Sequence, residues 1–166
     1  MNAAASVAAV ALFGLAATSV LGHGGENLGS PAAAKSISPE EHVFGRQGDP
    51  AKVSRTIAIG MSDALRFSPA EIRVKRGETI RFLVRNEGRL LHEMVIGTLE
   101  ELKEHGELMK KFPTMEHDEP YMAHVAPGKT QEIIWRFTKT GDFRFGCLVP
   151  GHLDGGMIGR IIVSGN

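Results

Sequence analysis

The sequence lacks the features of several common classes of protein. Its 166 residues include a single cysteine, so no disulfide can form within the chain and a disulfide-stapled fold is excluded. Lys and Arg together number 19, as do Asp and Glu, and the formal net charge is therefore zero. No basic excess favours a nucleic-acid partner, and no acidic excess indicates a disordered chain. Metal ions, small molecules and proteins therefore remain possible partners. The length of the chain suits one domain with a leader or tail.

The first 22 residues are apolar, rich in alanine and free of charge, and a polar glycine-rich segment follows them. This pattern predicts a signal peptide over residues 1–22, with a mature chain that begins at His23 and retains no membrane span. No Lys or Arg precedes the apolar run, and a buried alanine-rich helix is the alternative reading. Export would place the chain in an oxidising compartment, where a lone thiol is either buried and inert or bound to something.

The next segment, residues 23–52, has no hydrophobic periodicity and is rich in Gly, Pro and Ala. We expect it to form a flexible or loosely docked arm that carries His23 and His42. The remaining residues, 53–166, are expected to form one domain, since neither an internal repeat nor a second domain is visible in the sequence.

The predicted domain consists of short runs in which apolar and polar residues alternate. In the run 79–86, Ile80, Phe82 and Val84 share one side, and the residues between them include two arginines. The other alternating runs are residues 54–61, 70–78, 131–141, 141–147 and 157–165. Glycine and proline turns separate these runs, and the pattern predicts an all-β fold, an antiparallel β-sandwich.

One segment has a different pattern. Residues 98–112 place Leu99, Leu102 and Leu108 among charged side chains, which is typical of a short amphipathic helix. Thr98 followed three residues later by Glu101 predicts a capping box at its start. We expect this helix to be an insertion between strands.

The cysteine lies in a loop that holds other potential metal ligands. The alternation points Cys147 inward, which by itself fits an inert buried thiol. His152 and Met157 then follow at intervals of five residues, separated by glycine turns. A thiolate, an imidazole and a thioether suit copper, and a trigonal His₂Cys set with a weak axial Met is the blue-copper arrangement. The loop therefore predicts a copper site that needs a second histidine from elsewhere.

His92 is the best candidate for that second histidine. It follows the strand that ends near Asn86 and directly precedes the apolar run 94–96. In a Greek-key sandwich such a loop can lie beside the last loop of the chain. A surface or hydrogen-bonded histidine would be the default reading of His92 alone, but the Cys147 loop favours a ligand role.

These motifs resemble those of the cupredoxins, the plastocyanin- and azurin-like type 1 copper proteins. The resemblance spans roughly Val53 to Gly165 and rests on residues 67–88, 91–97 and 147–163. It implies an eight-stranded Greek-key β-sandwich that binds one copper ion. The implied ligands are His92, Cys147, His152 and Met157.

The arrangement is most similar to periplasmic cupredoxins associated with copper tolerance in proteobacteria. One departure from many electron-carrier cupredoxins is Glu93, which stands where an asparagine usually ties the two ligand loops together. The resemblance implies a periplasmic, monomeric protein that is not an enzyme. It also implies a redox partner that docks near His152, among Leu148, Val149, Pro150 and Leu153.

Two functions follow from this reading. The favoured one is copper tolerance, in which the protein binds copper and cycles it between Cu(I) and Cu(II). The alternative is a small carrier that shuttles electrons between respiratory partners. An oxidase or nitrite reductase is disfavoured because His-x-His and His-Cys-His clusters are absent from the sequence.

The sequence contains further methionines and histidines that could bind copper. Met115, His117, Met122 and His124 offer soft donors within ten residues, which is compatible with a weak Cu(I) site. The alternative, which we favour, is a loop that packs Met122 on the core and leaves the histidines in solvent. For the arm histidines, His23 and His42, a copper-binding role and an incidental solvated position are both open.

Overall fold

The computed structural model describes residues 36–165, except 114 and 116. The predicted signal peptide and His23 lie outside the described residues. Within the described ranges, no helix has the length and apolar character needed to cross a membrane.

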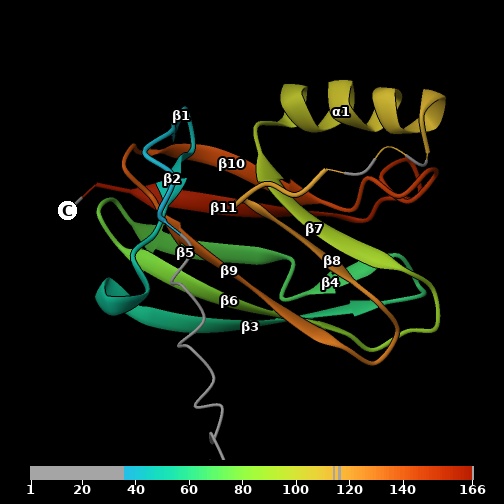
Figure 1. The fold of residues 1–166 in the computed structure, drawn as a ribbon, viewed down its shortest axis with the longest axis horizontal. Helices are drawn as coiled ribbons and strands as arrows, with labels where there is room; N and C mark the ends of the chain where they lie inside the picture. The colour runs from blue at the N-terminus through green and yellow to red at the C-terminus, as the bar shows by residue number, and fades with distance from the viewer. Residues whose placement is uncertain (1–35, 114, 116, 166) are drawn as a thin grey trace, which may run out of the picture. The chain divides into compact units, whose positions relative to one another are not determined.

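Two β-sheets face each other across a common core (Figure 1). One sheet has six strands in the order β1-β2-β9-β6-β3-β4, and the other has five in the order β5-β11-β10-β7-β8. The strands are β1 (Glu41–His42), β2 (Gly45–Gln47), β3 (Arg55–Ser62), β4 (Arg66–Ser68), β5 (Glu71–Lys75), β6 (Thr79–Asn86), β7 (His92–Gly97), β8 (Met122–Val125), β9 (Thr130–Arg136), β10 (Gly141–Gly146) and β11 (Ile158–Ser164). A 3₁₀ turn, η1 (Pro50–Lys52), and one helix, α1 (Leu99–Lys111), complete the fold. The predicted β-sandwich with a short helical insertion is confirmed.

The direction of two strand pairs differs from the prediction. β3 runs parallel to β6, and β5 runs parallel to β11, so both sheets are mixed rather than purely antiparallel. Alternating burial identifies which face of a strand is apolar, but it carries no information about the direction of the neighbouring strand. The parallel pairs arise because longer crossovers, rather than tight hairpins, connect these strands.

The core is built from the inward-facing residues of both sheets. In β6, the side chains of Ile80, Phe82 and Val84 are fully buried, as the alternation predicted. Trp135 on β9 is also buried, and its indole nitrogen donates a hydrogen bond to the carbonyl oxygen of Phe44 at 3.0 Å. The buried indole therefore keeps a partner for its polar atom, which its burial requires.

The segment around Phe44, which lies in the predicted arm, packs against the β-sandwich. β2 pairs with β9, and the Phe44 ring stacks on Trp135 with the centroids 5.3 Å apart. Phe44 is 2% exposed. The part of the expected arm that the structure describes, residues 36–52, thus contributes two strands to the six-stranded sheet. The docking residues are an isolated pair of short strands, too short for their periodicity to be visible in the sequence.

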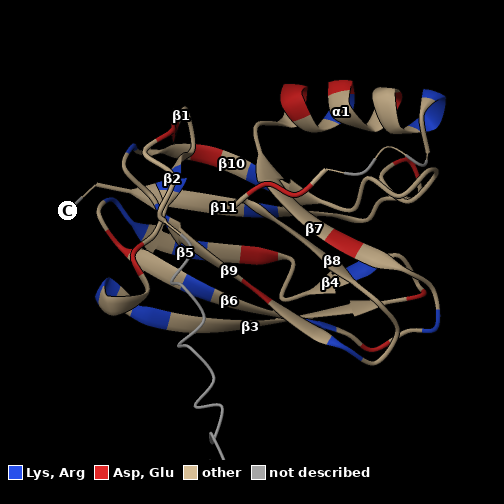
Figure 2. Ribbon diagram, in the orientation of Figure 1, with Lys and Arg blue, Asp and Glu red and all other residues tan. Residues whose placement is uncertain are grey.

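Helix α1 forms as predicted but buries a different face. The Thr98 side chain accepts a hydrogen bond from the Glu101 amide, and the Glu101 carboxylate accepts one from the Thr98 amide, which completes the capping box. Leu102 and Met109 are buried, packing with residues that include Val95 and Leu148. The other two predicted apolar positions, leucines 99 and 108, are 42% and 41% exposed. Figure 2 shows acidic residues in the first turn and basic residues in the last, a distribution that complements the helix dipole.

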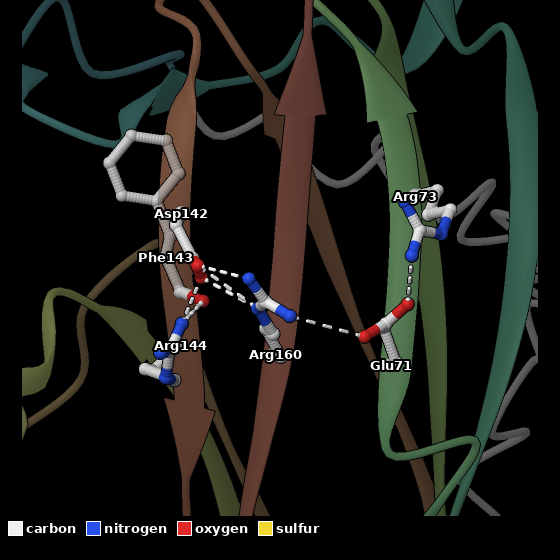
Figure 3. Close-up of polar contacts among 6 residues, drawn as sticks. All are labelled: Glu71, Arg73, Asp142, Phe143, Arg144 and Arg160. Carbon is white, nitrogen blue, oxygen red and sulfur yellow. Dashed lines mark hydrogen bonds and ion pairs between the residues drawn. The ribbon is translucent and has the colours of Figure 1, made fainter.

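A chain of charges crosses the outer face of the five-stranded sheet (Figure 3). Arg160 on β11 bonds to Asp142 on β10 through two nitrogens, at 3.0 and 2.5 Å, and it lies 3.5 Å from Glu71 on β5. Arg144 also contacts Asp142, and Arg73 contacts Glu71. The hydrogen bonds from Arg160 and Arg144 lower the pKa of Asp142 to about 2. Since these groups are exposed, we assign the network to strand registration rather than to a large stabilisation.

One glycine of β11 is required by the packing of an aromatic ring. Gly159 lies directly opposite Phe145 on β10, and a Cβ atom at position 159 would lie 2.1 Å from that ring. Phe145 is fully buried, so the ring has no space into which to move. We predict that Gly159→Ala lowers the free energy of unfolding by about 1–3 kcal/mol, the cost of overpacking. Urea denaturation measures this change.

The matched control is Gly165→Ala, because a Cβ atom at position 165 meets nothing within 4 Å. This control should stay within about 0.5 kcal/mol of the wild type. Equal stabilities for the two variants would contradict the packing role of Gly159.

Candidate metal centre

The sheet topology brings the predicted ligand loops to one end of the sandwich. β7 begins at His92, and β10 ends one residue before Cys147. The two strands are antiparallel neighbours, with Gly146 opposite Val95. The start of β7 therefore lies beside the end of β10, and two residues 55 positions apart in the chain become neighbours.

Three of the four predicted ligands offer donor atoms to a common point. The donor atoms of His92, Cys147 and His152 all lie within 4.8 Å of one another. The Cys147 sulfur is 3.3 Å from Nδ1 of His152, and the two imidazole rings have centroids 5.0 Å apart. Met157 is fully buried, and its backbone bonds to both Cys147 and His152.

The orientation of His92 is fixed by a residue from another loop. Asp63, in the turn after β3, has an oxygen 3.1 Å from Nε2 of His92, and it also accepts hydrogen bonds from the amides of Arg89 and Leu90. These hydrogen bonds, of which the one from Arg89 contributes most, lower the pKa of Asp63. An ionised Asp63 requires Nε2 to carry the proton, so Nδ1 of His92 keeps its lone pair. Nδ1 is buried and has no hydrogen-bond partner within the described part of the chain.

The unpartnered Nδ1 of His92 shows whether a metal ion fits this site. A buried polar atom without a partner is costly, and a metal ion would satisfy it. His92 lies beside a sulfur and a second imidazole, and this soft donor set suits copper. The residues present therefore fit a copper ion. A second residue holding the far nitrogen of a ligating histidine is the usual support for such a site.

Glu93 ties the two ligand loops together. Its backbone amide donates to the Cys147 sulfur at 3.4 Å, and its side-chain oxygen accepts from the Leu148 amide at 2.7 Å. Glu93 is 2% exposed, and its second oxygen lies 2.9 Å from Nδ1 of His124 on β8. The carboxylate performs here the loop-tying task that an asparagine performs in many electron-carrier cupredoxins.

The loop from Cys147 to Met157 is closed by its own backbone. The Met157 amide donates to the His152 carbonyl at 3.0 Å, and the Cys147 amide donates to the Met157 carbonyl at 3.1 Å. Gly151 and Gly156 adopt φ angles of +85° and +88°, which side-chain-bearing residues rarely reach. The two glycine turns on either side of His152 are therefore a conformational requirement of the loop.

Burial controls the protonation of the site. It raises the pKa of the Cys147 thiol to about 12, although backbone hydrogen bonds from Glu93 and Val149 oppose the rise. Burial, with a smaller effect from His92, lowers the pKa of His152. At neutral pH the metal-free site therefore holds a neutral thiol and a neutral imidazole.

The apolar surface near His152 differs from the expected one. Leu148 is 1% exposed and packs beneath α1, so it does not belong to that surface. Leu91 is exposed instead, and it lines a cavity of about 670 Å³ together with Val149 and Pro150. The cover of Leu148 by the helix is a tertiary contact that no local pattern predicts.

A β-sandwich with a His₂Cys donor set at one end defines a cupredoxin-type copper protein. The model of the family described as copper binding proteins, plastocyanin/azurin family, matches residues 53–164. The chain belongs to this family, and its cofactor is copper.

Two curated relatives are similar over most of the chain. The copper-resistant cuproprotein CopI of Rubrivivax gelatinosus is 45% identical over 149 residues, covering 90% of this chain and 90% of the relative. The copper-resistant cuproprotein CopI of Pseudomonas aeruginosa is 34% identical over 162 residues, covering 80% and 89%.

Solved structures give the same fold. The dithionite-reduced auracyanin of Roseiflexus castenholzii matches with a TM-score of 0.58 and 24% identity, over 68% of this chain and 98% of that one. Auracyanin B matches with a TM-score of 0.60 and 16% identity, over 72% and 96%. At these identities the likeness supports the fold alone.

The additional soft donors of the sequence do not share one environment. Met122 is 5% exposed and packs with Val95 and Leu102, as the favoured alternative expected. His117 and His124 are only partly exposed and have protein hydrogen-bond partners, so the expectation that both are solvated was wrong. His42 stacks on Phe44 and is likewise part of the folded unit.

The pairing of His124 with Glu93 predicts a pH dependence of stability. The hydrogen bond to Glu93 is the main cause of the raised pKa of His124, whose ordinary value is 6.5. A raised folded pKa means that the stabilisation is fully present below about pH 6.5 and is lost as the pH rises through the folded pKa. His124→Gln in the copper-free protein should therefore cost more stability at pH 6 than at pH 9.

Urea midpoints of the wild type and the variant at both pH values measure this difference. His105 and His152, whose pKa values are lowered, titrate in both proteins, so their contributions cancel in the difference between wild type and variant. The remaining difference reports on His124. An equal difference at pH 6 and pH 9 would show that the pairing does not involve a charged imidazole.

Proposed function

We propose that His92, Cys147, His152 and Met157 are the ligands of one type 1 copper ion. The main support is the convergence of one donor atom each from His92, Cys147 and His152 within 4.8 Å. The buried Nδ1 of His92, which has no partner among the described residues, adds to this support. Met157 is proposed as the weak axial ligand because it is buried at the end of the same closed loop. Copper in such a site supplies one-electron chemistry between Cu(I) and Cu(II).

The chain's own residues hold the donors in place. Asp63 keeps the proton of His92 on Nε2, and Glu93 holds the Cys147 loop against the start of β7. Each support comes from a strand end or a turn of the rigid sandwich, so the donors are expected to move little when the oxidation state changes. Since the thiol pKa is raised to about 12, metal uptake must displace a proton from Cys147.

We propose that the protein serves copper tolerance in the periplasm, where it binds copper and cycles between the two oxidation states. The observation that carries this proposal is its similarity to a copper-resistant cuproprotein, 45% identical and aligned over 90% of each chain. The apolar, uncharged segment 1–22 supports export. We expect a monomer without enzymatic activity of its own.

The second candidate is an electron carrier between respiratory partners. It is favoured by the exposed apolar residues directly before His92, where Leu90 and Leu91 are 50% and 49% exposed. An exposed apolar patch beside a redox site can serve as a docking surface for a partner protein. Both functions use the same copper site, and they differ in the phenotype that follows its loss.

Replacement of the thiolate tests the proposed ligand set. Cys147→Ser should abolish the intense visible absorption of the Cu(II) form, because that absorption needs a copper–thiolate bond. Met157→Leu is the matched control at the opposite end of the loop; it should retain copper and shift the colour and the reduction potential, since an axial thioether binds weakly. Survival of the colour in Cys147→Ser, or complete loss of copper from Met157→Leu, would refute the assignment.

Growth of a deletion strain across copper concentrations tests the biological role. The strain should become sensitive to copper, and the wild-type gene should rescue it while Cys147→Ser should not. Rescue by both genes would mean that tolerance does not need the type 1 site. A strain with normal copper tolerance but impaired respiration would instead establish the carrier function.

A further inference from the structure

A second group of soft donors lies outside the four proposed ligands. Three histidines from different elements meet there: His105 on α1, His117 in the segment between α1 and β8, and His124 on β8. The ring centroids of His105 and His117 are 4.6 Å apart, and those of His117 and His124 are 5.3 Å apart. Histidines positioned so closely by three separate elements are not explained by the type 1 site.

The hydrogen bonds determine which nitrogens are free. Nδ1 of His117 lies 3.1 Å from the carbonyl oxygen of Met115, and a carbonyl can only accept, so Nδ1 carries the proton. The lone pair of His117 is therefore on Nε2. That atom is buried and has no hydrogen-bond partner among the residues the structure describes. His117 thus presents the same feature as His92: a buried, unpartnered imidazole nitrogen.

His124 is excluded as a ligand by its own contacts. Its Nδ1 lies 2.9 Å from the Glu93 carboxylate, and its Nε2 lies 3.0 Å from the carbonyl oxygen of His117. Both partners are acceptors, so both nitrogens donate and neither offers a lone pair. His124 instead positions His117, because its ring holds the backbone of that residue.

The remaining donors are neutral and accessible. Burial, with a smaller effect from His117, lowers the pKa of His105, so this imidazole is uncharged at neutral pH. Met115 is 39% exposed, and its side chain and His117 both line the cavity of about 670 Å³ and a second cavity of about 510 Å³. His105 lines the second cavity. A metal ion can reach these donors from solvent without opening the core.

We propose that His105, His117 and Met115 form a second metal site that takes Cu(I). Imidazole and thioether are donors that suit soft Cu(I). The site does not include Cys147 or the other proposed type 1 ligands, and it does not depend on the assignment of their roles. Glu93 links the two regions, since it contacts both the Cys147 loop and His124.

Anaerobic Cu(I) titration of the full chain against a competing chelator tests the proposal. The wild type should bind one more Cu(I) than His117→Leu, and that variant should keep the visible absorption of the Cu(II) type 1 form. Met115→Leu should weaken the extra site without removing it. The matched control is Met122→Leu, which removes a buried thioether that packs under α1 and should leave the number and affinity of bound ions unchanged.

Imidazole ¹H–¹⁵N spectra identify the nitrogens involved. On addition of Cu(I), Nε2 of His117 and one nitrogen of His105 should shift, while His124 keeps both protons. The same spectra show whether each variant is folded, so a loss of binding through unfolding is recognised. Met115 lies between α1 and β8 and is exposed, so its substitution is compatible with folding.

Three results would overturn the proposal: equal Cu(I) stoichiometry in the wild type and His117→Leu, unchanged His117 and His105 signals, or binding of Zn²⁺ in preference to Cu(I). Failure of the type 1 assignment has a different signature. In that case the visible absorption would be absent or independent of Cys147, while the difference in Cu(I) stoichiometry between the wild type and His117→Leu would persist.

Discussion

The hydrogen bonds of one buried carboxylate hold the metal end of this protein together. Glu93 reaches the Cys147 sulfur through its amide, the Leu148 amide through one oxygen and His124 through the other. A buried charge is tolerated only when its lone pairs are satisfied, and here one carboxylate oxygen bonds to the Cys147 loop while the other bonds to β8. The geometry of the Cys147 loop, the start of β7 and the position of β8 therefore depend on this single residue.

The β-sandwich positions the parts of the site that the Glu93 carboxylate does not contact. Antiparallel pairing of β7 and β10 brings His92 and Cys147 together, and the glycine turns return the chain so that Met157 bonds to the Cys147 amide. Helix α1 then covers Leu148, which removes the residue after the cysteine from solvent. These contacts limit the motion of the donor atoms, and the resulting stiffness would suit the copper site proposed above.

Much of this could be predicted from the sequence, because the relevant signals are local. Alternation in β6 and β10 gave the apolar faces, and the spacing of Cys147, His152 and Met157 indicated the metal loop. The supports of the site could not be found in this way. Asp63 lies 29 residues before His92, and the tertiary fold alone brings them together.

The features that were not predicted from the sequence also depend on the tertiary fold. The docking of Phe44, the parallel strand pairs and the helix face buried over Leu148 all depend on contacts between distant segments. The pairing of His117 with His105 is of this kind too, since its two members come from an irregular segment and a helix. Periodicity describes which side of an element is apolar, whereas the identity of the neighbouring element is a property of the whole fold.

Burial of the Cys147 thiol affects the reactivity of the metal-free protein. Thiols react with oxidants and disulfides as thiolates, and a pKa of about 12 leaves almost none of Cys147 in that form. Its side chain is also fully shielded from solvent. The metal-free chain should therefore withstand peroxide and disulfide exchange for long periods, keeping its lone cysteine chemically intact until a metal ion removes the proton.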